Sequence, residues 1–101
     1  MNTFVSGFDW DSGNRAKCQK HGVSVDEIEG LFARPIMILP DTAHSTTEER
    51  LRAIGTTQAG RYVFLVFTVR ERHGEKFIRP ISARYMHQKE IDSYEEENPD
   101  L

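Results

Sequence analysis

Residues 61–70, RYVFLVFTVR, are the stretch that decides the fold of this chain. They are β-branched or aromatic almost throughout and apolar on both faces, which predicts a strand at the centre of a sheet. Turn residues bound this strand, with Gln58-Ala59-Gly60 before it and His73-Gly74 after it. The rest of the chain is therefore expected to arrange itself around one central strand.

Three further strands are predicted beside it. Residues 49–57 alternate between small or apolar and polar side chains, which is the period of a strand. Residues 76–83 form another strand, in which Pro80 cannot donate a ladder hydrogen bond, so a free edge is expected there. Residues 36–39 form a short apolar strand, and the polar run 41–48 forms a loop.

Three helices complete the pattern. Asp11 is placed to cap a helix over residues 12–20. Ser24 opens a second helix with a capping box, and Pro35 ends it. Residues 86–97 are helical by composition. The order α-α-β-β-β-β-α predicts an α+β fold, with two N-terminal helices, a four-stranded antiparallel sheet and a C-terminal helix, the helices packed on one face.

The bulk properties are those of a small globular protein. At 101 residues, of which 38% are hydrophobic, residues 1–101 are expected to form a single domain. Cys18 is the only cysteine, which excludes an intramolecular disulfide and a cysteine-based zinc site. The longest apolar stretch, 62–67, is too short to cross a bilayer, and no signal peptide opens the chain. We therefore expect a cytoplasmic protein without a membrane segment, a metal or another cofactor.

The net charge of −3 hides three blocks of different sign. Residues 1–49 hold 4 Lys/Arg and 8 Asp/Glu, residues 50–89 hold 9 and 2, and residues 90–101 hold none and 6. Seven of the nine bases in the middle block are Arg, whose planar guanidinium suits bidentate contacts to phosphate. The middle block is therefore suited to binding a polyanion such as RNA.

Four groups of residues carry a family resemblance. They are Phe8-Asp9-Trp10-Asp11; Lys20-His21-Gly22-Val23-Ser24; Asp41, His44-Ser45, Glu48-Glu49-Arg50 and Ile54-Gly55; and Arg79-Pro80-Ile81-Ser82-Ala83-Arg84 with Glu90 and Tyr94-Glu95. In their order and spacing, over about residues 8–95, they resemble the BrnT family of toxins from type II toxin–antitoxin systems. The chain departs from the family pattern at Cys18, where Asn is usual, at Pro80, where an aliphatic residue is usual, and at Met86, where a small residue is common.

The resemblance implies a RelE-like fold and a metal-independent ribonuclease that inhibits translation by cleaving RNA. It also implies a cognate antitoxin, a BrnA-like ribbon-helix-helix DNA-binding protein that neutralises the toxin. The two proteins are expected to form a 2:2 heterotetramer that is dimerised through the antitoxin. Only the antitoxin is expected to contact operator DNA. The Pro80 departure is expected to shift the strand that aims Arg79 and Arg84.

RNA is cleaved without a metal when its own 2′-hydroxyl attacks the adjacent phosphate, which requires a base, a cation at the transition state and an acid. Arg79 and Arg84 are the candidates for the catalytic cations, with ion pairs to Glu90 and Glu95 as the alternative role. The candidates for RNA or phosphate binding are Arg50, Arg61, Lys76 and Tyr85, and those for the acid and base are His44, Glu49 and His87.

Two other functions compete with the ribonuclease. One is a non-catalytic RelE-like binding module that acts as a co-repressor with a DNA-binding antitoxin. The other is a nucleic-acid-binding domain that has no protein partner. The placement of the basic block on strands favours the ribonuclease, whereas the lack of an undisputed acid–base pair leaves the other two open.

Overall fold

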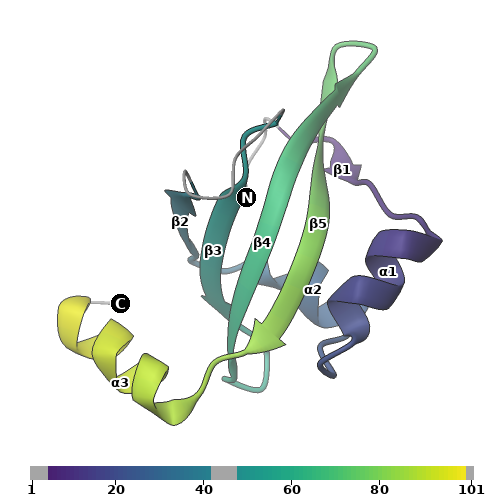
Figure 1. The fold of residues 1–101 in the computed structure, drawn as a ribbon. Coiled ribbons are helices and arrows are strands. Elements are labelled where there is room, and N and C mark those ends of the chain that lie inside the picture. The colour runs from purple at the N-terminus through teal and green to yellow at the C-terminus, as the bar shows by residue number, and fades with distance from the viewer. Residues whose placement is uncertain (1–4, 42–47, 100–101) are drawn as a thin grey trace.

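Five strands form one sheet, in the order β1 (Gly7–Phe8), β5 (Glu75–Tyr85), β4 (Tyr62–Arg72), β3 (Leu51–Thr56) and β2 (Met37–Pro40), so the predicted central strand, β4, is indeed central. The computed structural model of the protein describes residues 5–41 and 48–99 (Figure 1). Its elements are β1 (Gly7–Phe8), α1 (Ser12–Gln19), α2 (Val25–Leu31), β2 (Met37–Pro40), β3 (Leu51–Thr56), β4 (Tyr62–Arg72), β5 (Glu75–Tyr85) and α3 (Gln88–Glu97). The α+β class is confirmed.

Strands β2 to β5 form an antiparallel meander, which confirms this part of the predicted sheet. The β4–β5 hairpin turns at His73 and Gly74, whose φ angles of 53° and 80° are both left-handed. Two-residue hairpin turns use this conformation because its twist matches that of the strands. At the β3–β4 turn, the Gly60 N–H donates to the Thr57 carbonyl at 2.9 Å.

The prediction of a four-stranded, fully antiparallel sheet is wrong because β1 adds a fifth strand, parallel to β5. The two residues of β1 lie beside Phe77 and Ile78. Beyond them, the Asp9 N–H donates to the Ile78 carbonyl at 2.8 Å. A strand of two residues has no readable period, so the sequence carries no local signal for it.

Capping boxes start both N-terminal helices, as predicted for α2. In α1 the Asp11 carboxylate accepts from the Asn14 N–H at 2.9 Å, and in α2 the Ser24 hydroxyl accepts from the Glu27 N–H at 3.1 Å. Both helices then turn buried side chains toward the sheet. The resulting core consists of Cys18, Val23, Ile28, Leu31, Ala53, Val63, Leu65, Phe67, Ile78 and Ala83.

Gly55 shows which face of the sheet α2 covers. A Cβ atom on Gly55 would lie 3.4 Å from the Leu31 side chain of α2, so this position and its β4 partner Val63 face the N-terminal helices. Because side chains alternate along a strand, Ile54 and Phe64 point to the opposite side. This opposite side is the open face of the sheet.

Helix α3 lies apart from the other two helices, which corrects the prediction that all helices share one face. The Tyr94 ring of α3 meets the Tyr62 ring with a centroid distance of 5.7 Å. Tyr62 precedes Val63 and therefore points to the open face. The only apolar side chains of α3 are Ile91 and Tyr94, and no residue of this helix is fully buried. The helix therefore adds no layer to the core. Figure 1 shows it projecting beyond the end of the sheet.

A β-bulge interrupts the β4–β5 ladder. Val66 pairs with Ser82 and Phe67 pairs with Pro80, which leaves Ile81 as the extra residue. Bulges are among the few places in a sheet where proline is tolerated. The unusual proline is therefore accommodated by a local change of register.

The side chain of Asn14 joins α1 to β5 beside the bulge. Its amide donates to the Pro80 carbonyl and to the Asp9 carbonyl, each at 2.9 Å. The pairing of β1 with β5 has already ended at Ile78, so the predicted free strand edge at Pro80 is confirmed. A buried side chain, rather than a strand, satisfies that edge.

Candidate nucleic-acid interface

Strands β3, β4 and β5 place two rows of side chains across the open face. The first row is Arg52, Val66 and Ser82, and the second is Ile54, Phe64 and Arg84. Neighbours in such rows lie within contact distance because their Cβ atoms are about 5 Å apart. The register thus sets arginines beside apolar side chains on a surface that α1 and α2 do not cover.

The first row borders a hollow of about 280 Å³ in the open face. This cationic hollow is lined by Lys17, Asp41, Arg50, Arg52, Phe64, Val66, Ile81 and Ser82. Three of the lining side chains are cations and one is an acid, so the hollow has a positive charge. Within the described part of the chain, Arg52 and Lys17 form no ion pair, which leaves both available to an anionic ligand.

The bulge decides where the two predicted catalytic arginines point. Arg79 and Arg84 are five positions apart, and because this step is odd, a regular strand would send them to opposite faces. The extra residue Ile81 shifts the alternation, so that Arg79 lies opposite Thr68 and Arg84 opposite Phe64, on the same face. The bulge lies next to Pro80, which stands between the two arginines.

Arg84 is held by α3. Its guanidinium donates two hydrogen bonds to the Glu90 carboxylate, at 2.7 and 2.8 Å, and lies 5.0 Å from the Phe64 ring centroid. The hydrogen bonds from Arg84 and from the His87 N–H hold the pKa of Glu90 down at about 2. Glu90 therefore stays charged near neutral pH, and Arg84 has the carboxylate partner that was predicted as its alternative role.

Arg79 is held at the β1–α1 junction. Its guanidinium lies 2.8 Å from the Asp11 carboxylate and 3.6 Å from that of Asp9, and its side chain is 19% exposed. Asp9 also pairs with Arg72 at 3.1 Å. The Asn14 N–H and then Arg79 lower the pKa of Asp11. Arg79 thus ties two segments together, with partners that differ from the predicted Glu90 and Glu95.

Two of the predicted RNA-binding residues lie on the other side of the sheet. Tyr85 pairs with Val63, whose side chain faces the N-terminal helices. Its hydroxyl donates to the Glu27 carboxylate at 2.6 Å, which raises the pKa of Tyr85, and Arg61 stacks 3.4 Å from its ring centroid. Lys76 lies beside the β4–β5 hairpin. Only Arg50 of this predicted set lines the cationic hollow.

Of the three predicted acid and base residues, the two that the structure describes lie apart, one before β3 and one before α3. His44 falls outside the described residues. Glu49 is exposed, with its backbone carbonyl accepting from the Thr68 hydroxyl at 2.7 Å. His87 is exposed just before α3. Cys18 is buried, which raises its pKa to about 11 and keeps the thiol protonated.

Sequence reasoning missed Lys17 and Phe64 as members of this surface. Lys17 belongs to the last turn of α1, and no local pattern connects it with strands far along the chain. Phe64 belongs to the strand predicted to be buried on both faces, yet it is only partly buried and lies under the Arg84 guanidinium. Successive side chains of a strand point to opposite faces, so half of the side chains in residues 61–70 must face away from the helices. This was the one signal in the sequence for the position of Phe64.

Residues 5–41 and 48–99 contain neither a group of metal-ligating side chains nor a helix that could span a membrane. In these ranges, no three His, Cys, Asp or Glu side chains come together in a way that would hold a metal ion. Nor does any helix in them have the length and apolar character needed to cross a membrane.

Comparison with known proteins identifies the family. No curated protein matches the chain. Residues 10–90 match the family model described as "Ribonuclease toxin, BrnT, of type II toxin-antitoxin system". The match covers most of the chain and includes α1, α2, β2 to β5 and the start of α3. The chain therefore belongs to the BrnT family of ribonuclease toxins.

Proposed function

We propose that this protein is a metal-independent endoribonuclease that inhibits translation by cleaving RNA on the open face of its sheet. The cationic hollow carries the proposal, because Lys17 and Arg52, which form no ion pair within the described residues, bring positive charge to a concave surface. Such a surface attracts the phosphate backbone of RNA. The ribonuclease description of the family agrees with this use of the surface.

The surface offers contacts to both parts of a nucleotide. Arg50, Arg52 and Lys17 line a hollow of about 280 Å³ and would bind phosphate groups. The Arg84 guanidinium, stacked on Phe64, extends this surface as a flat cation on which a base can stack. Arg61, Lys76 and Tyr85 lie outside the hollow, where they would contact more distant parts of the RNA.

Cleavage would proceed by attack of the RNA 2′-oxygen on the adjacent phosphorus, as the P–O5′ bond breaks. A base takes the 2′-hydroxyl proton and an acid protonates the 5′-oxygen, leaving a 2′,3′-cyclic phosphate and a 5′-hydroxyl. We assign the cationic role to Arg84, with Arg79 as the second catalytic cation, because the bulge turns both to one face. His44, Glu49 and His87 are the candidates for base and acid.

The proposed cellular setting follows from the family. A type II toxin has a protein antitoxin, and we propose a BrnA-like ribbon-helix-helix protein in a 2:2 heterotetramer located in the cytoplasm. Operator DNA would be bound only through this antitoxin. No cofactor enters the proposed reaction, since permanent arginine charge supplies the stabilisation of the phosphorane-like transition state.

Cleavage of RNA by the purified protein tests the proposal. We expect fragments with 2′,3′-cyclic phosphate ends, at the same rate with and without EDTA. Arg52→Gln should slow cleavage about 100-fold, the effect of removing one preorganised charge contact. Arg72→Gln is the matched control, since Arg72 is an exposed arginine at the hairpin and should change the rate less than about threefold.

Three outcomes would overturn parts of this proposal. Loss of cleavage in EDTA would refute the metal-independent mechanism. Equal rates for the Arg52→Gln variant and the unmodified protein would move the site away from the cationic hollow. Intact RNA together with tight antitoxin binding would favour the non-catalytic co-repressor instead.

A further inference from the structure

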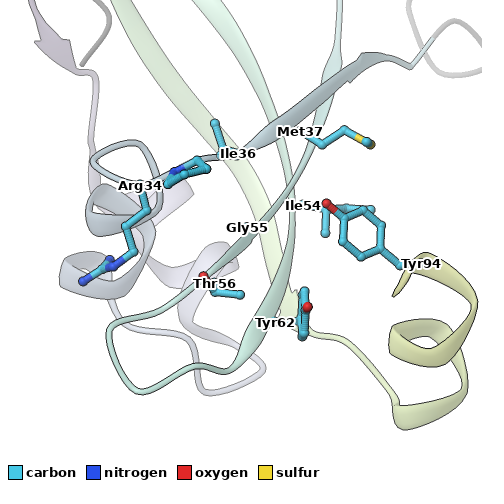
Figure 2. A pocket seen from close by; sticks show the side chains of 9 residues that line it. Arg34, Ile36, Met37, Ile54, Gly55, Thr56, Tyr62 and Tyr94 are labelled. Atoms are coloured by element: carbon cyan, nitrogen blue, oxygen red, sulfur yellow. The ribbon is translucent and has the colours of Figure 1, made fainter. Parts of the chain in front are cut away.

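An apolar groove lies between the edge of the sheet and α3. It has a volume of about 650 Å³ and is lined by Arg34, Pro35, Ile36, Met37, Ile54, Gly55, Thr56, Tyr62 and Tyr94. Figure 2 shows the Tyr94 ring turned toward Ile54, with Met37 and Tyr62 on neighbouring strands. Only Arg34 among the lining side chains carries a charge, so this groove has little to offer a phosphate backbone.

The groove continues into the cationic hollow. A second hollow of about 440 Å³ shares Ile54 and Tyr94 with the groove. The same hollow shares Phe64 with the cationic hollow. The three hollows therefore lie in a row across the open face, and we call this row the trough. It is apolar at the β2 end, is lined by Lys89, Glu90 and Glu97 in the middle, and is positively charged at the α1 end.

The sheet edge beside the groove is also apolar. Strand β2 ends the sheet order, so none of the described strands pairs with its outer edge. Leu39 pairs with Arg52, points to the open face and is 43% exposed, whereas Ile38 pairs with Ala53 and points to the opposite face. Large apolar side chains on an edge strand next to an apolar groove are typical of a surface that binds another protein.

We propose that this trough binds one segment of the antitoxin, with apolar side chains in the groove and Asp or Glu side chains in the cationic hollow. The inference rests on the proposed function and adds the surface through which inhibition occurs. Charge complementarity selects acidic side chains at the α1 end, because Lys17 and Arg52 there are unpaired within the described residues. A segment bound in this way excludes RNA from the hollow.

Two substitutions on adjacent residues of β2 test the surface. Met37 lines the groove and pairs with Ile54, whereas Ile38 pairs with Ala53 and does not line it. The cognate antitoxin, purified separately from the toxin, is titrated against each variant by calorimetry. We expect Met37→Glu to weaken the affinity of the toxin for the antitoxin about 30-fold or more, as substitution of an interface hot spot does. Ile38→Glu should weaken the same affinity less than about threefold.

A second variant guards against a folding defect in the first. Tyr94→Ala removes the α3 wall of the groove, and α3 contributes no buried residue to the core. Circular dichroism and RNA cleavage, both unchanged, would show that each variant is folded. Loss of antitoxin affinity in Met37→Glu and Tyr94→Ala, but not in Ile38→Glu, supports the trough.

Unchanged antitoxin affinity in the two groove variants would overturn the inference, as would equal losses at Met37 and Ile38. The charged end has its own readout, since Arg52→Gln should weaken antitoxin binding and reduce its salt dependence. Failure of the proposed function would give a different result. If the protein cleaves no RNA, but the groove variants alone lose affinity for the antitoxin, the ribonuclease proposal is refuted and the antitoxin-binding trough is supported.

Discussion

Glu90→Gln should make the ribonuclease faster, because the Glu90 carboxylate competes with RNA phosphate for Arg84. The two groups form a bidentate pair at 2.7 and 2.8 Å, and the guanidinium lies over Phe64 at 5.0 Å from its centroid. Gln keeps the size of the side chain and its carbonyl but removes the negative charge. Arg84 then becomes available to the substrate without a change of fold.

The size of the effect follows from the exposure of the pair. The Arg84 and Glu90 side chains are 37% and 36% exposed, so solvent screens much of their attraction. Bidentate geometry places the pair near the top of the range for exposed pairs, at about 1 kcal/mol. Release of that competition corresponds to about a fivefold gain in kcat/KM. The free energy of unfolding should fall by no more than about 1 kcal/mol.

Steady-state cleavage of a fluorogenic RNA oligonucleotide measures the gain. Asp92→Asn is the matched control, because it removes one charge from an exposed position of α3 that bonds only to Gln88 among the described residues. We expect that control to change kcat/KM less than about twofold, through general screening alone. A loss of cleavage in Glu90→Gln, as large as that in Arg84→Gln, would refute the competition and make Glu90 part of the working site.

Two further predictions concern stability. Asn14→Leu should lower the free energy of unfolding by about 2–3 kcal/mol in urea titrations, because it leaves the Pro80 and Asp9 carbonyls without the Asn14 amide; a loss below about 1 kcal/mol would show that water replaces it. Acid should remove the contribution of Glu90 to the free energy of unfolding. Because folding lowers the pKa of Glu90 from 4.5 to about 2, this contribution is present at a pH above 4.5 and is lost as the pH falls toward about 2. Thermal unfolding should therefore be less pH-dependent over that range in Glu90→Gln, and identical curves would contradict the assignment.

The candidate site could be predicted only in part. Clustering of arginine in residues 50–89 indicated a polyanion surface, and Arg50 and Arg52 do line the cationic hollow. The ion pairs of Arg79 with Asp11 and Asp9 could not be foreseen, because they join segments that β1 brings together. Lys17 was missed for the same reason.

Local interactions made much of the fold readable from sequence. The central strand follows from its β-branched and aromatic residues, and the capping boxes at Asp11 and Ser24 depend on contacts within three residues. The hairpin at His73-Gly74 depends on the φ angles that a two-residue turn requires. Family membership belongs here too, since residues 10–90 carry it in their order and spacing.

Only the tertiary structure decided how these elements present a surface. The two-residue strand β1, the bulge at Ile81 and the separate position of α3 all depend on contacts between residues far apart in the chain. The bulge turns Arg79 and Arg84 to one face, and α3 walls the apolar end of the trough. Periodicity describes one strand or helix at a time, whereas register and packing depend on the partners that each strand or helix finds.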